Sequence, residues 1–265
     1  MKILFSMLSS WRTALSTLVL SAHGHHGGSK RSAAIGSILL VMAMFVACGD
    51  DDSDFATQPS GSSPLSSSSA KANDSEYDAI ANTLKDLRDG QIYRTVRIGK
   101  QVWMAENLNY KTEESYCYND EESKCAWYGR LYRWVAAISA CPSGWHLPTA
   151  GELEELVVTV DGSITKSDLN ITAGIKLKST SGWKSYEGKS GDGTDDFGFS
   201  ALPAGAKYGY AGDYDEGKYT TFWSSTDDGN SAYSLFLAYD RDYVHLTSSS
   251  DKLTGCSVRC LKDDP

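Results

Sequence analysis

Histidine, serine and carboxylate side chains carry much of enzyme catalysis, but their spacing in this sequence fits no familiar catalytic motif. Only two histidines follow residue 48, His146 and His245, and neither belongs to an HExxH pair that would hold zinc. No GxSxG motif is present, so a nucleophile elbow is absent. We interpret His146, within Gly-Trp-His-Leu-Pro, as a structural residue satisfied by a backbone carbonyl. The sequence therefore predicts a protein that binds and is not an enzyme.

One short segment could hold a metal ion. Asp192-Gly-Thr-Asp-Asp196 places the carboxylates of Asp192, Asp195 and Asp196 around a glycine, and hard oxygen ligands of this kind bind calcium. The segment lacks the full EF-hand pattern, so a solvated turn is the alternative interpretation. No other cofactor is expected.

Aromatic residues interleaved with Gly and Asp gather in the second half of the chain. The ligand-binding candidates are Trp183, Tyr186, Tyr208, Tyr210 and Tyr214, and Tyr219, Tyr239 and Tyr243 continue the set. Aromatic faces beside acidic acceptors suit the CH-rich faces and hydroxyls of sugars, and tyrosine also serves protein interfaces. We predict that residues 182–218 form a recognition loop whose aromatics are exposed. The remaining tryptophans are assigned to the core: Trp103, Trp127, Trp134, Trp145 and Trp223.

These aromatics favour two classes of function. The first is a glycan-binding or adhesion module, whose partner is a polysaccharide. The second is a structural or protein-interaction surface component without glycan binding, whose partner is a cell-surface protein.

Five cysteines follow Cys48, and in an exported protein disulfides are the default: they are Cys117, Cys125, Cys141, Cys256 and Cys260. Cys256 and Cys260 lie on one predicted strand about 13 Å apart, beyond the roughly 7 Å Cα limit for a disulfide. Cys117 and Cys125 flank a polar segment and can pair with each other. We predict the bridges Cys117–Cys125 and Cys141–Cys260 with Cys256 left over, and a Cys141–Cys256 bridge as the alternative.

The elements that position these residues are read from periodicity and turn signals. A hairpin is predicted from residues 92–98 and 101–104, with Gly99 at the turn. Helices are predicted over 130–140 and from the capping box Thr149-Ala-Gly-Glu152, whose buried stripe is Leu153, Leu156, Val157 and Val160. Late strands are predicted at residues 222–225, 232–239, 243–247 and 257–261. Two helices framed by strands, with a loop-rich middle, form an α+β arrangement.

The first 47 residues are predicted to be a signal peptide. Residues 33–47 are an uncharged apolar run preceded by Lys30 and Arg31. This run is shorter than the roughly 20 residues of a membrane-spanning helix. Residues 1–29, which contain three histidines, are attributed to a misassigned start codon. The histidines are then no metal site.

The junction of Ala47 and Cys48 resembles the lipobox of bacterial lipoproteins, which implies that Cys48 is lipidated. The alternative is a secretory leader cleaved elsewhere, with Cys48 as an ordinary thiol. Residues 48–85 are predicted to hold the lipid anchor and a flexible tether rich in Ser and Asp, too poor in apolar residues to fold. We expect a protein of the bacterial cell envelope, anchored to the outer membrane by its lipid and facing outward.

Net charge argues against a nucleic-acid partner. Removal of residues 1–47 leaves 21 basic and 34 acidic residues, a net charge of −13. Phosphate binding needs a basic stripe, and no cluster of Lys or Arg follows residue 48.

From residue 86 to 263 the sequence resembles the Fibrobacter succinogenes major paralogous domain. Eight motifs carry the resemblance in order: DLRDGQIY from Asp86, QVWMAENLNY from Gln101, CYND from Cys117, YGRLY from Tyr128, CPSGWHLP from Cys141, DFGFSALPAG from Asp196, FWSST from Phe222 and SVRC from Ser257. The resemblance implies a disulfide-stapled, C-type-lectin-like fold, two helices with short antiparallel strands and a long loop-rich region, at the cell surface.

The same resemblance bears on activity. The family is similar to formylglycine-generating enzymes, which need two cysteine thiols converging on copper. Here Cys256 and Cys260 both lie close to the last strand, and the predicted bridge removes one of the thiols, so oxidase activity is not expected. Cys256 stands where the family usually has an aromatic residue, which implies a semi-buried free thiol.

Overall fold

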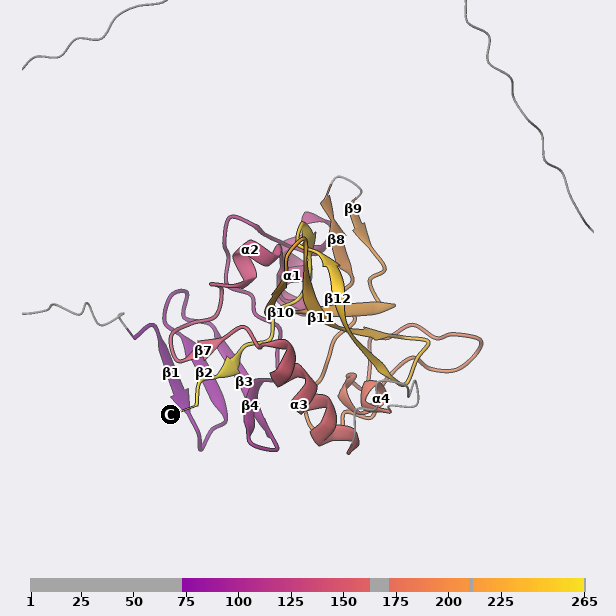
Figure 1. Cartoon of the computed structure of the whole chain (residues 1–265), viewed down its shortest axis with the longest axis horizontal. Helices are drawn as coiled ribbons and strands as arrows, with labels where there is room; N and C mark the ends of the chain where they lie inside the picture. The colour runs from indigo at the N-terminus through magenta and orange to yellow at the C-terminus, as the bar shows by residue number, and fades with distance from the viewer. Residues whose placement is uncertain (1–72, 163–171, 210–211, 265) are drawn as a thin grey trace, which may run out of the picture. The chain divides into compact units, whose positions relative to one another are not determined.

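The largest sheet of the protein has six antiparallel strands, in the order β1-β2-β3-β4-β14-β7 (Figure 1). The computed structural model describes residues 73–162, 172–209 and 212–264. The strands are β1 (Ser75–Asp78), β2 (Thr83–Asp86), β3 (Ile92–Ile98), β4 (Gln101–Met104), β7 (Trp145–His146) and β14 (Leu261–Lys262). The last strand of the chain, β14, therefore lies between two strands that precede it in the sequence, β4 and β7.

The first two strands correct the predicted boundary of the tether. Residues 75–85 were assigned to the tether, but together with Asp86 they form the β1–β2 hairpin, which pairs with β3. Leu84 and Asp86 are fully buried, and the Ser75 hydroxyl donates to the carbonyl of Ser143 over 2.7 Å. Contacts with distant parts of the chain order this polar segment, and its composition does not reveal them. The β3–β4 hairpin has the predicted bounds, with Gly99 at φ 60° in its turn.

Three smaller sheets complete the strands. β10 (Tyr219–Asp228), β11 (Ser231–Ala238) and β12 (Val244–Asp251) form an antiparallel meander, which confirms three predicted late strands and extends two of them. β13 (Thr254–Gly255) pairs with β8 (Ala206–Tyr208), and β8 pairs with β9 (Gly212–Tyr214). β5 (Ser115–Tyr116) pairs with β6 (Leu131–Tyr132).

The helices are short. They are α1 (Glu122–Tyr128), α2 (Trp134–Ala137), α3 (Ala150–Asp161) and α4 (Ala173–Leu177), with a 3-10 turn η1 (Tyr118–Asp120). The predicted capping box opens α3, because Thr149 N donates to Glu152 Oε2 over 2.6 Å and Glu152 N donates to Thr149 Oγ1 over 3.2 Å. Among the described residues no helix is long and apolar enough to cross a membrane. The fold is α+β and richer in strand than in helix.

The predicted helix over residues 130–140 is wrong in its first part. Tyr132 N donates to the carbonyl of Cys256 over 2.7 Å, and Cys256 N donates back to the carbonyl of Tyr132 over 3.0 Å. This pairing holds residues 131–132 extended as β6, so only residues 134–137 become helical, as α2. A partner more than a hundred residues away overrides the local periodicity.

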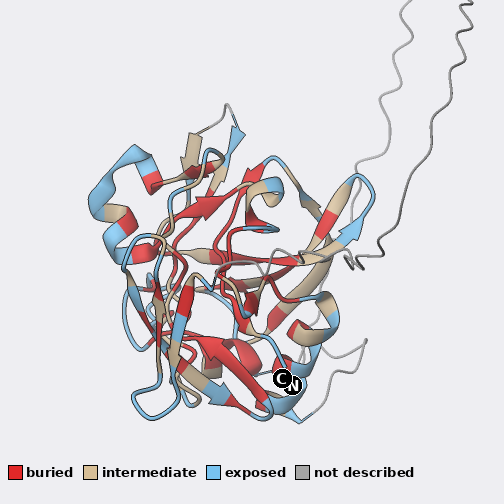
Figure 2. Ribbon diagram, turned by 90° about the vertical axis from the view of Figure 1, so that its left-hand side faces the viewer, coloured by how far each residue is buried: buried red, intermediate tan, exposed pale blue. Residues whose placement is uncertain are grey.

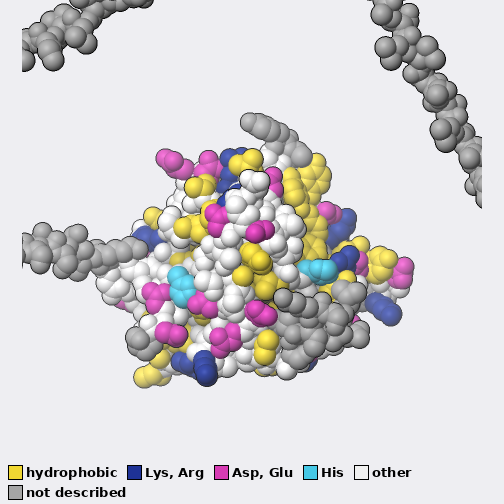
Figure 3. Space-filling model, in the orientation of Figure 1, with side chains coloured by type: hydrophobic (Ala, Val, Ile, Leu, Met, Phe, Trp, Pro, Cys, Tyr) yellow, Lys and Arg dark blue, Asp and Glu magenta, His cyan; other side chains and the backbone are white. Residues whose placement is uncertain are grey.

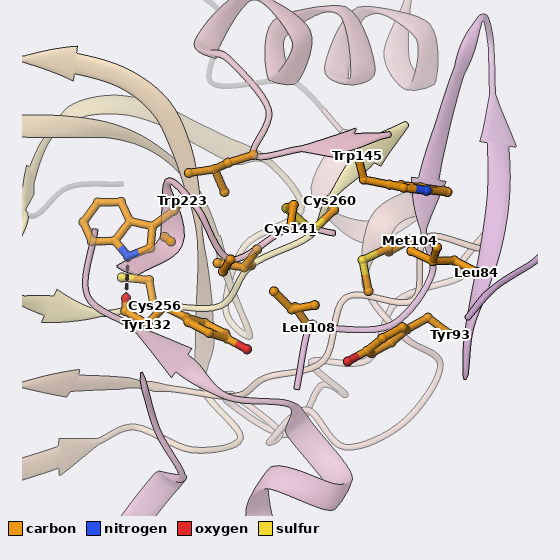
Figure 4. Close-up of a cluster of buried hydrophobic side chains, with 14 of the residues drawn as sticks. Leu84, Tyr93, Met104, Leu108, Tyr132, Cys141, Trp145, Trp223, Cys256 and Cys260 are labelled. Carbon is orange, nitrogen blue, oxygen red and sulfur yellow. Dashed lines mark hydrogen bonds between the residues drawn. A yellow bond between two sulfur atoms is a disulfide. The ribbon is translucent and has the colours of Figure 1, made fainter. Parts of the chain in front are cut away.

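Among the described residues, the core consists of two large clusters of buried side chains and a small third one around Tyr118 and Tyr128 (Figure 2). In one large cluster, the predicted stripe of α3 packs against Ile98, Trp103, Phe199, Phe222 and Leu235. The other large cluster surrounds the Cys141–Cys260 bridge (Figure 4). There the indole nitrogen of Trp223 donates to the carbonyl of Tyr132 over 2.7 Å.

The cysteine predictions are confirmed. Disulfides join Cys117 to Cys125 and Cys141 to Cys260, and Cys256 is a free thiol. Cys256 is 1% exposed, so it is fully buried and not semi-buried. Burial raises the pKa of its thiol far above the ordinary value, which keeps it protonated and unreactive.

Candidate functional site

Six aromatic rings form a continuous row across β9, β8, β10, β11 and the start of β12. We call this row the aromatic ladder; its members are Tyr214, Tyr208, Tyr219, Phe236, His245 and Tyr243. Neighbouring ring centroids lie 5.0–6.5 Å apart, except that Tyr208 and Tyr219 meet through their hydroxyls at 3.3 Å. Hydrophobic side chains gather along the β8–β9 hairpin on the face shown in Figure 3.

Strand alternation places the ladder on the face of the meander that α3 does not cover. Leu235 and Leu237 of β11 are fully buried in the cluster that contains α3, so Phe236 between them points to the opposite face. The register pairs Phe236 with Thr221 on one side and with His245 on the other. Three strands therefore contribute one row of side chains to this face.

A hollow of about 320 Å³ lies beside the ladder. Its lining combines rings with many hydroxyls: Tyr208, Thr221, Ser234, Phe236, Arg241, His245, Thr247, Ser249 and Ser250. Ser234 Oγ lies 2.6 Å from Ser250 Oγ, and Thr247 Oγ1 lies 2.8 Å from Ser249 Oγ. His245 Nε2 has no hydrogen-bond partner. The hollow thus offers apolar faces, hydroxyl groups and one guanidinium.

The β8–β9 end of the ladder is fixed by ion pairs. Lys207 Nζ lies 3.0 Å from a carboxylate oxygen of Asp120 and 3.0 Å from one of Asp213. Burial, followed by the hydrogen bond to Tyr208, raises the pKa of Tyr219, so this phenol stays neutral. Ion pairs therefore fix the β8–β9 end of the ladder beside a neutral phenol at Tyr219.

The predicted ligand-binding residues are divided by the structure. Tyr208 and Tyr214 belong to the ladder and are 42% and 44% exposed. Tyr186 is equally exposed at 44%, but it lies edge-on against Tyr239 and not in the ladder. Tyr210 lies outside the described residues.

Trp183 corrects the prediction of an exposed recognition residue. It is 5% exposed and packs in the same cluster as α3, and its indole nitrogen lies 3.1 Å from both Ser179 Oγ and the Ala201 carbonyl oxygen. The opposite error concerns Trp127, which was assigned to the core but is 64% exposed on α1. Of the other predicted core tryptophans, Trp134 is half-buried and the rest are buried: Trp103, Trp145 and Trp223.

The predicted calcium ligands do not converge. Asp192 accepts hydrogen bonds from the Trp183 backbone and the Ser190 hydroxyl, each over 2.9 Å. Asp195 accepts from the backbone and hydroxyl of Ser200, and Asp196 is exposed. Within the described ranges, the one group of three potential metal ligands within 4.8 Å is Cys117, Glu122 and Cys125, and its cysteines form a disulfide. The carboxylates of Asp192 and Asp195 therefore form hydrogen bonds with nearby residues of the same part of the chain.

Comparison with known families now identifies the domain. A family model described as the Fibrobacter succinogenes major domain matches residues 96–262, more than half of the chain. The chain belongs to the Fibrobacter succinogenes major domain family. No curated protein and no solved structure matches it.

In this Fibrobacter succinogenes major domain, three of the motif segments meet at Arg259. Its guanidinium is 1% exposed; Nε donates to Asn107 Oδ1 over 2.7 Å and Nη2 to the Ser200 carbonyl over 2.9 Å. It also donates to the carbonyls of Met104 and Phe199. Burial lowers the pKa of Arg259 to about 9, and among the described residues no carboxylate forms an ion pair with it. The sequence analysis missed this residue, although a charge inside the apolar segment Val258–Cys260 is a signal for a buried, fully bonded side chain.

His146 of the Fibrobacter succinogenes major domain is held by carboxylates and not by the predicted backbone carbonyl. Its Nδ1 lies 2.6 Å from Asp263 Oδ1, and its Nε2 lies 3.0 Å from Glu152 Oε1. Burial opposes protonation, but the hydrogen bonds to Asp263 and Glu152 outweigh it and raise the pKa of His146. This imidazole joins β7 to the start of α3 and to the segment after β14, which is a structural role.

Proposed function

We propose that the protein is a non-catalytic lipoprotein of the cell surface whose domain binds polysaccharide through the aromatic ladder. The observation that carries the proposal is the ladder itself, a row of six rings beside a hydroxyl-lined hollow of about 320 Å³. Sugar rings present CH faces that pack on aromatic rings and hydroxyls that exchange hydrogen bonds with Ser and Thr. A row of such positions suits a chain of sugar residues.

The ring orientations favour a single, soluble glycan chain as the ligand. Neighbouring ladder rings are inclined to each other by 43° to 81°. A flat crystalline surface would need coplanar rings, whereas a flexible chain can follow a twisted row. Tyr208 and Tyr214 form the exposed end of the row. Further along the row, Phe236 and His245 line the hollow.

Anchoring and fold complete the proposal. Cys48 and residues 49–72 lie outside the described residues, and the proposed lipid at Cys48 would hold the domain on the outer face of the outer membrane. We propose a C-type-lectin-like arrangement for the domain, supported by its α+β content and by the two disulfides.

Tyr208→Ala and Tyr214→Ala test the proposal, with Tyr186→Ala as a matched control of the same residue type and exposure. Each ladder variant is expected to weaken binding to a soluble polysaccharide about fivefold, since an aromatic contact contributes about 1 kcal/mol. Affinity electrophoresis in gels containing soluble polysaccharides measures the change, and Tm is expected to stay within a few degrees. Equal binding by all three variants would contradict the ladder as the site.

The same assay separates the alternative function. Wild-type protein that is retarded by none of the polysaccharides but is retained by a cell-surface protein would indicate a structural or protein-interaction component. Binding to crystalline polysaccharide with none to the soluble form would contradict the proposed single-chain ligand.

A further inference from the structure

A second pocket lies away from the aromatic ladder, beneath the exposed indole of Trp127. Its volume is about 160 Å³, half that of the hollow beside the ladder. Its walls come from the start of β3, the segment after β4, the end of α1 and residues 200–202. Trp127 is 64% exposed and Ile92 is 61% exposed, so two large apolar side chains stand at this pocket without burial.

The pocket is built on a rigid floor. Arg259 holds Asn107 through its Oδ1 and Ser200 through its carbonyl, and both residues line the pocket. At Gly129, φ is 73° and a Cβ atom would lie 2.6 Å from the Cβ of Asn107, so only glycine lets the end of α1 approach this closely. The Cys117–Cys125 bridge ties the residue before η1 to α1. Cys125, on α1, also lines the pocket. Binding here would cost little ordering of the protein.

The lining is polar and locally neutral. Glu106 accepts hydrogen bonds from the backbone and the guanidinium of Arg94, over 2.6 and 3.4 Å, so the two charges compensate each other. Gln91 and Asn109 add side-chain amides to the lining. The wall therefore has acceptor capacity to offer and no net charge.

We propose that this pocket binds one uncharged sugar residue, such as a glycan chain end, with its CH face on Trp127 and its hydroxyls donating to the Glu106 carboxylate and the amide oxygens. A volume of about 160 Å³ fits a single sugar ring, whereas the longer row of the ladder fits a chain. Charge compensation between Arg94 and Glu106 disfavours uronic acids and other anions. The site is independent of the ladder, because the two share no lining residue.

Tryptophan fluorescence of the full chain tests the pocket directly. Glucose, galactose, mannose, xylose and N-acetylglucosamine are the neutral probes, and glucuronic acid is the charged one. At least one neutral sugar is expected to shield Trp127 from acrylamide quenching, with a Kd of about 1 mM. Trp127→Phe should lose this optical signal while it still binds sugar in equilibrium dialysis, and Trp127→Ala should bind about tenfold more weakly.

Two further variants separate this proposal from the ladder. Val135→Ala, at a similarly exposed apolar position of 68%, is the control and should leave the sugar response unchanged. Tyr208→Ala should also leave it unchanged while it weakens polysaccharide binding. Quenching that responds to none of the neutral sugars, or to glucuronic acid alone, would overturn the single-sugar pocket. Loss of the response in Tyr208→Ala would overturn its independence.

Discussion

Trp183 and Trp127 give the sharpest test of the structure, because sequence and structure assign them opposite roles. Trp183→Ala removes an indole that is 5% exposed, together with hydrogen bonds of 3.1 Å to Ser179 Oγ and to the Ala201 carbonyl. Trp127→Ala removes an indole that is 64% exposed. The two changes delete the same atoms from two different environments.

The magnitudes follow from burial. Truncation of a buried tryptophan to alanine lowers the free energy of unfolding by about 3–5 kcal/mol. The Ala201 carbonyl keeps its hydrogen bond from Ser179 N, over 3.0 Å, so the lost burial of the indole sets the expected loss within that range. For a domain of this size each kcal/mol lowers Tm by about 2–4 °C, so Tm is expected to fall by roughly 6–20 °C. The exposed Trp127 should change stability by about 0.5 kcal/mol or less.

Thermal unfolding followed by circular dichroism measures both variants under identical oxidising conditions. Trp183→Phe is a useful intermediate, because it keeps most of the apolar volume and loses only the N–H donor. A fall in Tm of under about 2 °C for Trp183→Ala would refute its burial and restore it as a candidate recognition residue. A large fall for Trp127→Ala would refute its exposure.

Four further predictions concern the Cys141–Cys260 bridge, the Cys256 thiol, His146 and Cys48. Replacing Cys141 and Cys260 by Ser should lower the free energy of unfolding by about 2–5 kcal/mol in denaturant titrations. Cys256 should react with maleimide only after denaturation, since it is 1% exposed; labelling of the native protein would contradict its burial. Folding raises the pKa of His146, so the protonated imidazole stabilises the folded state. This contribution is complete below the pKa of His146 in the unfolded chain, about 6.5, and is lost as the pH rises through the pKa in the folded protein. Urea unfolding from about pH 5 to 9 should show that decrease in the wild type and a smaller one in His146→Gln. Cys48→Ala should release soluble protein from membranes, and unchanged detergent partitioning would end the lipoprotein proposal.

Local signals in the sequence predicted the features that are fixed locally. The signals for α3 lie within the helix itself: the capping box at Thr149 marks its start, and the apolar stripe beginning at Leu153 marks its buried face. Both features were therefore predicted. The β3–β4 hairpin is defined by Gly99 and by two alternating runs beside it. The disulfide pairing could be predicted because Cys256 and Cys260, four residues apart on an extended segment, stand too far from each other to form a bridge.

Burial of individual aromatics could not be predicted, because it depends on contacts between distant segments. Trp183 stands in a Gly-rich stretch that is typical of a loop, yet it packs into the α3 cluster. Trp127 lies on α1, a short helix that contains the bridged Cys125 and that no periodic pattern in the sequence predicts. The ladder depends on the register that sets Thr221 beside Phe236 and Phe236 beside His245, which one strand alone does not determine.

The position of β14 sets the order in which the domain can be assembled. Met104 N donates to the Cys260 carbonyl over 3.0 Å, Leu108 N donates to the Val258 carbonyl over 2.9 Å, and β14 lies between β4 and β7. A chain that crosses a membrane from its N-terminal end delivers this segment after all the strands that it joins. Until then β4 has an open edge, and the thiol of Cys141 waits for a partner 119 residues further on. For the exported lipoprotein proposed above, folding and oxidation would therefore follow transport, and a chain arrested in transit would present unpaired strand edges to its neighbours.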